Sequence, residues 1–211
     1  AVIGQTGNLA PADKKMYALR DVTATVGSIP LITSSIMSKK LAAGSHSIVL
    51  DVKVGSGAFM KTVEDARTLA EKMVEIGKRC GRNMTAVLTD MNTPLGHNVG
   101  NSLEIIEAVN VLKGEKTGDL REVCLALASN MISLSLGIPI DEALKKAENA
   151  VESGAALKKM TEWISEQGGD ASYITDTSRF EKPKFSRSVK AAQSGYIASM
   201  DAEKIGISAV E

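Results

Sequence analysis

Residues 16–40, with the sequence MYALRDVTATVGSIPLITSSIMSKK, organise the rest of this chain. The stretch predicts two helices separated by a short break. Tyr17 and Arg20, in the first helix, are three residues apart and share one face. In the second helix, spacings of three, four and seven residues place four side chains on one face: Ile32, Ser35, Ile36 and Lys39.

The face of the second helix is mixed in character. A helix meant only for packing would carry aliphatic residues there, whereas a hydroxyl and an ammonium group interrupt this face. Together with Tyr17 and Arg20, these groups would suit a flat ligand that is anionic or carries an amide. The pattern also fits two ordinary helices whose basic residues, Arg20 and Lys39, are solvated, because exposed basic residues are the default. Spacing alone leaves both interpretations open.

Composition places the chain among ordinary globular proteins. Its 211 residues, 44% hydrophobic and 24% charged, suit one domain, or a small domain with part of a second. The net charge is zero, which gives no electrostatic case for binding nucleic acid or an anionic membrane. An aromatic content of 3% also disfavours a platform for stacking bases.

Several absences point to a cytoplasmic protein. No apolar run approaches the roughly 20 residues that span a bilayer, and the N-terminus AVIGQTGN lacks the basic start of a signal peptide. Cys80 and Cys124 fit no metal-binding spacing, so we expect buried free thiols in a reducing compartment. Residues 1–4 begin inside an apolar run without a methionine, and we expect the chain to be a fragment of a longer protein.

The hydrophobic pattern predicts an α/β fold. Strands at 47–52 and 86–90 flank a helix at 62–82, which predicts a right-handed βαβ unit with parallel strands. The first of these strands shows little alternation, so we expect it to be buried on both faces. Thr62 is the expected N-cap of the helix, with Asp65 in an acidic variant of the capping box.

Other expected elements surround this unit. They are a buried strand at 1–5, a turn at 5–8, helices at 11–25 and 28–42 separated at Gly27, helices at 102–112, 120–136, 140–153 and 155–167, a polar loop at 168–185, and β-type alternation at 186–210.

We therefore expect a small helical-domain segment, a mainly parallel α/β domain and the start of a C-terminal lobe that contains β-structure. The expected bounds are 1–11 for a strand end and linker, 12–43 for the helical segment, 44–185 for the α/β domain, and 186–211 for a truncated C-terminal α+β lobe.

Two loops follow the predicted strands. Residues 53–59 are glycine-rich and could cradle phosphate on backbone N–H groups. They match neither a Walker loop nor a full dinucleotide fingerprint, so a tight turn is at least an equal alternative. Residues 91–101 follow the second strand at its carboxyl end, where ligands bind in open α/β sheets.

Few side chains suggest chemistry on their own. His46 and His97 are the only histidines, and a lone histidine is more often a satisfied polar residue than a catalytic base. Glu107 lies in the helix after the second loop. Its carboxylate and nearby loop carbonyls could hold a hard cation, or it could be a surface glutamate.

Four motifs occur in order along the chain: YALRDVTATVGSIPLITSSIMSKKLAAG from Tyr17, IVLDVKVGSGAFMK from Ile48, VLTDMN from Val87, and PLGHNVGNSLEIIEAV from Pro94. Together they closely resemble the pyrimidine-nucleoside phosphorylase and thymidine phosphorylase family, and the resemblance covers nearly the whole chain. It implies phosphorolysis of uridine, thymidine or deoxyuridine by phosphate, which gives a free pyrimidine and (deoxy)ribose 1-phosphate. It also implies a helical domain facing an α/β domain, a cytoplasmic homodimer, and no organic cofactor.

The resemblance assigns roles to residues of this chain. Arg20, Ser35 and Lys39 would hold the polar edge of the pyrimidine, and the two cations would act catalytically by stabilising charge on the departing base. The pocket around the base would be lined by Tyr17, Val26, Ile32, Ile36 and Phe59. The backbone carbonyls of Leu95 and Asn98 and the carboxylate of Glu107 would contribute to a potassium site.

The chain also departs from the family pattern. The K-H-S-T-G-G phosphate loop, with the histidine expected to protonate the base, would lie before Ala1, and neither His46 nor His97 matches that histidine. Gly27 stands where relatives often carry Asp or Asn, and His46 stands where an acidic residue is common. We therefore expect this chain to hold the base half of the site and to be inactive alone.

Two other interpretations stay open. One is an anthranilate-type phosphoribosyltransferase, which would need diphosphate and magnesium motifs that the sequence lacks. The other is a non-catalytic module that binds bases or a partner.

Overall fold

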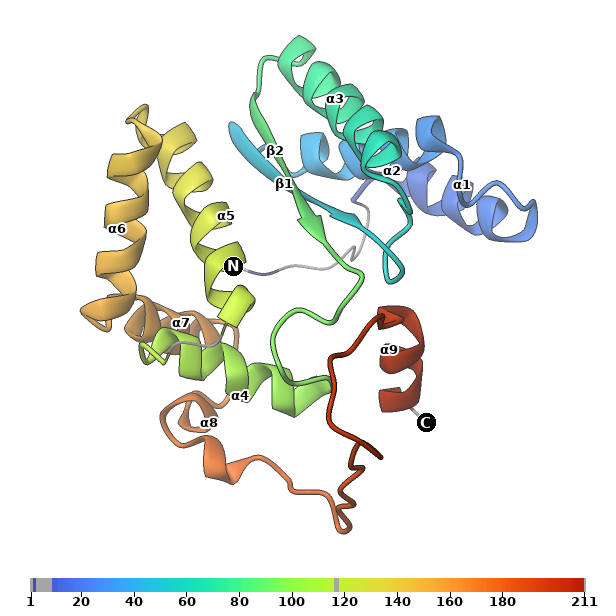
Figure 1. The fold of residues 1–211 in the computed structure, drawn as a ribbon. Coiled ribbons are helices and arrows are strands. Elements are labelled where there is room, and N and C mark those ends of the chain that lie inside the picture. The colour runs from blue at the N-terminus through green and yellow to red at the C-terminus, as the bar shows by residue number, and fades with distance from the viewer. Residues whose placement is uncertain (1, 3–8, 116–117, 211) are drawn as a thin grey trace.

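A parallel pair of strands lies at the centre of the computed structural model, which describes residues 2, 9–115 and 118–210 (Figure 1). β1 (Ser47–Val54) pairs with β2 (Asn83–Asp90) in parallel, from Ser47 opposite Asn83 to Val54 opposite Asp90. The helix α3 (Val63–Arg79) connects them. The expected parallel βαβ arrangement and the α/β fold class are confirmed, with β1 ending later and β2 beginning earlier than predicted.

Helices make up most of the remaining chain. They are α1 (Pro11–Val22), α2 (Ile29–Ala42), α4 (Asn101–Leu112), α5 (Gly118–Leu136), α6 (Ile140–Glu152), α7 (Ala155–Glu166), α8 (Ser172–Thr175), the 3-10 turn η1 (Thr177–Arg179) and α9 (Ala202–Val210). The helices from α4 to α7 agree with the predicted ranges to within two residues. α8 and η1 lie in a stretch that was expected to be loop.

The main core lies between one face of the strands and the helices α2 and α3. β1 contributes alternate residues, Ile48, Leu50, Val52 and Val54, which pack with Ile32 and Met37 of α2 and Leu69 and Met73 of α3. The other face of β1 is only partly covered by α5, where Ser47 Oγ donates to the carbonyl of Leu134 over 3.4 Å. The prediction that β1 is buried on both faces was therefore wrong, since Asp51 is exposed on that second face.

The start of α3 is the one that its sequence predicts. Thr62 Oγ1 accepts from the amide of Asp65 over 3.1 Å and donates to Asp65 Oδ2 over 2.8 Å. The helix ends at Arg79, before the predicted Arg82. It stops because Gly81 adopts a φ of +71° and the amide of Arg82 turns back to the carbonyl of Gly77 over 3.0 Å.

α1 also ends before the predicted residue 25. Its last residue is Val22, because the hydroxyl of Thr23 donates to the carbonyl of Leu19 over 3.0 Å and Ala24 takes a φ of +54°. The chain thus leaves the helix at Ala24 rather than at Gly27. Ser28 occupies the N-cap position of α2, and Pro30 lies in the first turn, as expected.

The C-terminal segment differs most from prediction. The alternation at 186–210 does not form a strand: residues 181–200 are exposed throughout, and α9 follows. Within the described residues this segment pairs with neither β1 nor β2, and a strand without a partner leaves its backbone groups to water. The expected strand at 1–5 and turn at 5–8 lie outside the described residues, apart from Val2.

The two cysteines are free, as expected, but both are exposed rather than buried. In the described part of the chain, no single helix is both long and apolar enough to cross a membrane; α5 and α6 pass that test only as a pair bent by 119°.

Candidate functional site

α1 and α2 bring together the four polar and aromatic residues singled out in residues 16–40. Lys39 Nζ donates to Ser35 Oγ over 2.9 Å on α2. On α1, the guanidinium carbon of Arg20 lies 4.7 Å from the ring centroid of Tyr17, and Lys39 Nζ lies 5.9 Å from the same centroid. These distances place both cations beside the face of one ring, within the range of cation–π attraction.

Burial argues against the interpretation that Arg20 is solvated. Arg20 is 6% exposed, so it is not the solvated end of an ordinary helix. Its Nε is buried and, among the described residues, has no hydrogen-bond partner. A buried N–H group without an acceptor is unfavourable, so this donor is suited to an acceptor from outside the chain.

A small cavity adjoins this cluster. Its volume is about 20 Å³, and Tyr17, Arg20 and Ser35 line it. That volume holds about one water molecule and is smaller than a pyrimidine ring. In this conformation only the edge of a base could reach these polar groups.

A larger cavity of about 600 Å³ lies between α2, β1, the loop after β1 and α9. Ile32, Ile36 and Phe59 all line it, and Phe59 is 66% exposed at its rim. The residues predicted to share one pocket therefore divide between two neighbouring cavities, polar groups toward α1 and apolar groups toward β1. Val26 is half-buried in the connection between α1 and α2, and neither Val26 nor Lys39 is among the residues that line these two cavities.

The glycine-rich loop after β1 uses its own amides. Gly55 N donates to Met60 O, Ser56 N to Asn92 Oδ1, Gly57 N to Met91 O and Ala58 N to Gly55 O, over 2.9 to 3.2 Å. Gly55 has a φ of +133°, and a Cβ there would lie 2.6 Å from the amide nitrogen of Asn92. The loop is thus a tight turn packed on the segment after β2, and the phosphate-cradle interpretation was wrong for this conformation.

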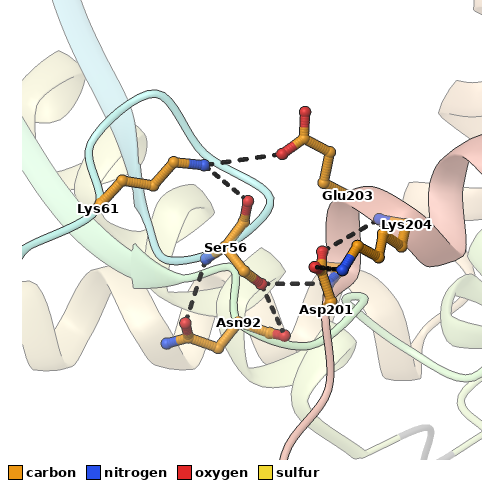
Figure 2. Close-up of polar contacts among 7 residues, drawn as sticks. Ser56, Lys61, Asn92, Asp201, Glu203 and Lys204 are labelled. Atoms are coloured by element: carbon orange, nitrogen blue, oxygen red, sulfur yellow. Dashed lines mark hydrogen bonds and ion pairs between the residues drawn. The ribbon is translucent and has the colours of Figure 1, made fainter.

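Figure 2 shows how α9 is attached to this loop. The amide of Ala202 donates to Ser56 Oγ over 3.1 Å, and Ser56 Oγ donates to the carbonyl of Asn92 over 3.2 Å. Lys61 Nζ donates to Ser56 O over 2.8 Å and lies 3.8 Å from Glu203 Oε2. The Lys204 amide, which donates to Asp201, lowers the pKa of that carboxyl. Glu203 is therefore brought to the rim of the larger cavity, opposite Lys61.

Glu107, predicted as a cation ligand or a surface residue, is 4% exposed. Its carboxylate accepts from the amides of His97 (2.8 Å) and Asn98 (2.9 Å), so the surface alternative was wrong. An ionised carboxylate has about four lone-pair positions, and two remain for a cation. Leu95 and Asn98 belong to the loop that Glu107 contacts, and the potassium site stays a prediction. The described residues contain no cluster of three or more His, Cys, Asp or Glu suited to a metal, so such a site would depend on carbonyl oxygens.

The histidines lie elsewhere. His46 precedes β1 at the amino end of the sheet, where Arg82 Nη1 lies 3.5 Å from His46 Nδ1. The backbone of His97 contacts Glu107, as described above. The structure gives neither side chain a contact with Arg20, Ser35 or Lys39 in the described part of the chain.

Sequence reasoning missed Asp13 as part of the cluster. This residue is 7% exposed, and its Oδ2 lies 2.9 Å from Lys39 Nζ. The sequence signal was weak, because an acidic residue in the first turn of a helix is already explained by the helix dipole.

Comparison with known proteins identifies the family of this chain. Residues 1–157 match the glycosyl transferase family, a/b domain. The chain belongs to this family. Over all 211 residues it is 50% identical to a pyrimidine-nucleoside phosphorylase of Geobacillus stearothermophilus, and 52% identical to proteins of the same name from Bacillus subtilis and Staphylococcus aureus. The match covers 100% of this chain and 49% of each relative, so the chain spans about half of their length. The resemblance noted from the sequence motifs is thereby confirmed.

Proposed function

We propose that the protein to which this chain belongs catalyses phosphorolysis of pyrimidine nucleosides, with uridine, thymidine and deoxyuridine as substrates. The observation that carries the proposal is the cluster of α1 and α2, in which a buried guanidinium with an unpaired Nε lies beside a lysine and a serine. Relatives at 50–52% identity that bear the name pyrimidine-nucleoside phosphorylase support it.

The chemistry explains why two cations are needed. As the glycosidic bond breaks, negative charge accumulates on the departing base. Arg20 and Lys39, fixed in a largely buried site, stabilise that charge more in the transition state than in the bound substrate. Ser35 can both donate and accept, which suits the imide N–H of a pyrimidine beside its carbonyl. Ile32, Ile36 and Phe59 would cover the faces of the ring from the neighbouring cavity.

Potassium is part of this proposal. Leu95 and Asn98 would supply carbonyl oxygens and Glu107 a carboxylate oxygen, and the ion would brace the loop that follows β2. The support is the buried position of Glu107 against this loop.

The proposal assigns only half of the site to this chain. Phosphate would be bound by residues outside this chain, because the amides of the glycine-rich loop already donate hydrogen bonds within the protein. We infer that this chain alone is inactive and that the complete enzyme works as a homodimer. Phosphorolysis by the isolated 211-residue chain would contradict this inference.

The decisive experiment uses a full-length protein that contains this chain. Release of uracil or thymine from uridine or thymidine should require inorganic phosphate. Arg20→Met and Lys39→Met should each lower kcat/KM by roughly 30- to 1000-fold, the equivalent of about 2–4 kcal/mol of transition-state stabilisation. Lys40→Met is the matched control, because Lys40 is the neighbouring exposed lysine on α2. Near-normal turnover in the Arg20 and Lys39 variants would contradict the assignment.

A further inference from the structure

We propose that Asp13 is a positioning residue that holds the ammonium group of Lys39 for catalysis. The inference rests on the proposed function. Asp13 Oδ2 lies 2.9 Å from Lys39 Nζ, and the Asp13 side chain is 6% exposed while that of Lys39 is 26% exposed. The carboxylate of Asp13 is therefore buried, whereas the side chain of Lys39 stays partly exposed and accessible to a ligand.

The contact joins two helices. Asp13 lies in the first turn of α1, and Lys39 lies in the last turn of α2. A lysine side chain is flexible and would otherwise sample several rotamers. Since Lys39 Nζ also donates to Ser35 Oγ over 2.9 Å, it is fixed from both helices at once.

The number of donors on the ammonium group matters here. Of its three N–H groups, one is directed to Asp13 and one to Ser35, so within residues 9–115 and 118–210 one remains for a ligand. The third N–H group belongs to Lys39 Nζ, which lies 5.9 Å from the Tyr17 ring centroid, in the same cluster as the unpaired Nε of Arg20. Asp13 thus restricts the directions in which Lys39 can donate to the base, and it also lines the small cavity between the two helices.

The test uses Asp13→Asn, which keeps the shape and one oxygen acceptor but removes the charge. In the full-length enzyme, kcat for uridine should fall about 10- to 100-fold, by analogy with losing the outer partner that orients a metal ligand. The KM for phosphate should stay unchanged, because the proposal places phosphate elsewhere. The loss should be smaller for 5-fluorouridine, whose more acidic base needs less charge stabilisation as it departs. Asp13→Glu should restore part of the activity.

A double-mutant cycle separates positioning from a general loss of structure. Asp13→Asn should cause no further loss in a Lys39→Met background, because its effect acts through Lys39. The control Glu142→Gln removes a carboxylate from an exposed ion pair with Lys146 (3.6 Å) and should leave kcat unchanged. Equal losses from Asp13→Asn in both backgrounds, or kcat within twofold of wild type, would overturn the inference.

A second readout does not depend on activity. Reductive methylation followed by mass spectrometry should modify Lys39 more slowly than the exposed Lys40, and Asp13→Asn should raise the Lys39 rate severalfold. An unchanged rate would overturn the claim that Asp13 holds Lys39. A second outcome is possible: Asp13→Asn changes the labelling of Lys39 as expected, but the wild-type enzyme shows no phosphorolysis. That outcome would overturn the proposed function and the catalytic role that depends on it.

Discussion

Gly96 lies against Glu107 so closely that a Cβ on residue 96 would stand 2.8 Å from Glu107 Oε2. Gly96 also has a φ of +78°, in the left-handed region that favours glycine. The loop after β2 therefore depends on a glycine for two independent reasons, its backbone conformation and its contact with a buried carboxylate.

Gly96→Ala should separate these two reasons when it is compared with Gly81→Ala. Gly81 has a similar φ of +71°, but a Cβ there would meet nothing within 4 Å. Gly81→Ala should lower the free energy of unfolding by about 1 kcal/mol for conformation alone. Gly96→Ala should cost about 1–3 kcal/mol more, because the added methyl group displaces Glu107. Urea unfolding of both variants measures the difference, and equal losses would show that the contact is unimportant.

Glu107→Gln tests the two amide contacts of the carboxylate. A glutamine offers one acceptor oxygen, so the amide of either His97 or Asn98 loses its partner inside the protein. The free energy of unfolding should fall by about 1–3 kcal/mol. Glu104→Gln is the control on the same helix: Glu104 is exposed and accepts from the amide of Gly100 (3.0 Å), a contact that water can replace. A smaller loss at Glu107 than at Glu104 would contradict the buried arrangement.

Ser56→Ala should loosen α9 from the glycine-rich loop. The hydroxyl of Ser56 accepts from the amide of Ala202 and donates to the carbonyl of Asn92, and alanine removes both contacts. Hydrogen exchange at the amide of Ala202 should become faster, by roughly the factor of five that corresponds to a hydrogen bond of about 1 kcal/mol. Ser208→Ala, which removes a hydroxyl that donates to the carbonyl of Lys204 within α9, should leave exchange at Ala202 unchanged.

Cys124 provides a prediction about pH. Although the residue as a whole is exposed, surrounding protein atoms partly desolvate the Cys124 thiol and raise its pKa. Nearby Lys53 lowers this pKa and Asp51 raises it further, each to a smaller extent. Only the thiolate reacts with iodoacetamide, so a raised pKa lowers the fraction of Cys124 that is reactive at any pH below that pKa. In a Cys80→Ser variant, the alkylation rate of Cys124 should therefore rise at a higher pH than the alkylation rate of free cysteine. A profile that coincides with free cysteine, or precedes it, would contradict the prediction.

Local features could be predicted from the sequence because their causes lie a few residues apart. Thr62 and Asp65 form the expected cap of α3, and the spacing from Ser35 to Lys39 yields the expected hydrogen bond along α2. The end of α1 was missed although it is also local. The hydroxyl of Thr23 competes for helix carbonyls, and this effect outweighed the glycine at position 27.

Contacts between distant segments could not be predicted from residue patterns. Asp13 and Lys39 are 26 positions apart, and nothing in the sequence around either residue indicates the other. The burial of Glu107 depends on how the loop at 95–98 folds back onto α4. Alternation at 186–210 could not distinguish a strand from an exposed segment followed by a helix, because strand formation depends on a partner elsewhere in the chain. The expected domain bounds stay predictions.

The turn at Gly55–Ala58 has a consequence for how a ligand would be received. Its four amides are bonded to the protein before any ligand arrives, so this stretch loses its conformational freedom during folding. A ligand can then bind without a further entropic penalty for ordering the turn. Phe59 follows a turn that is already ordered, rather than a segment that becomes ordered only when the ligand binds.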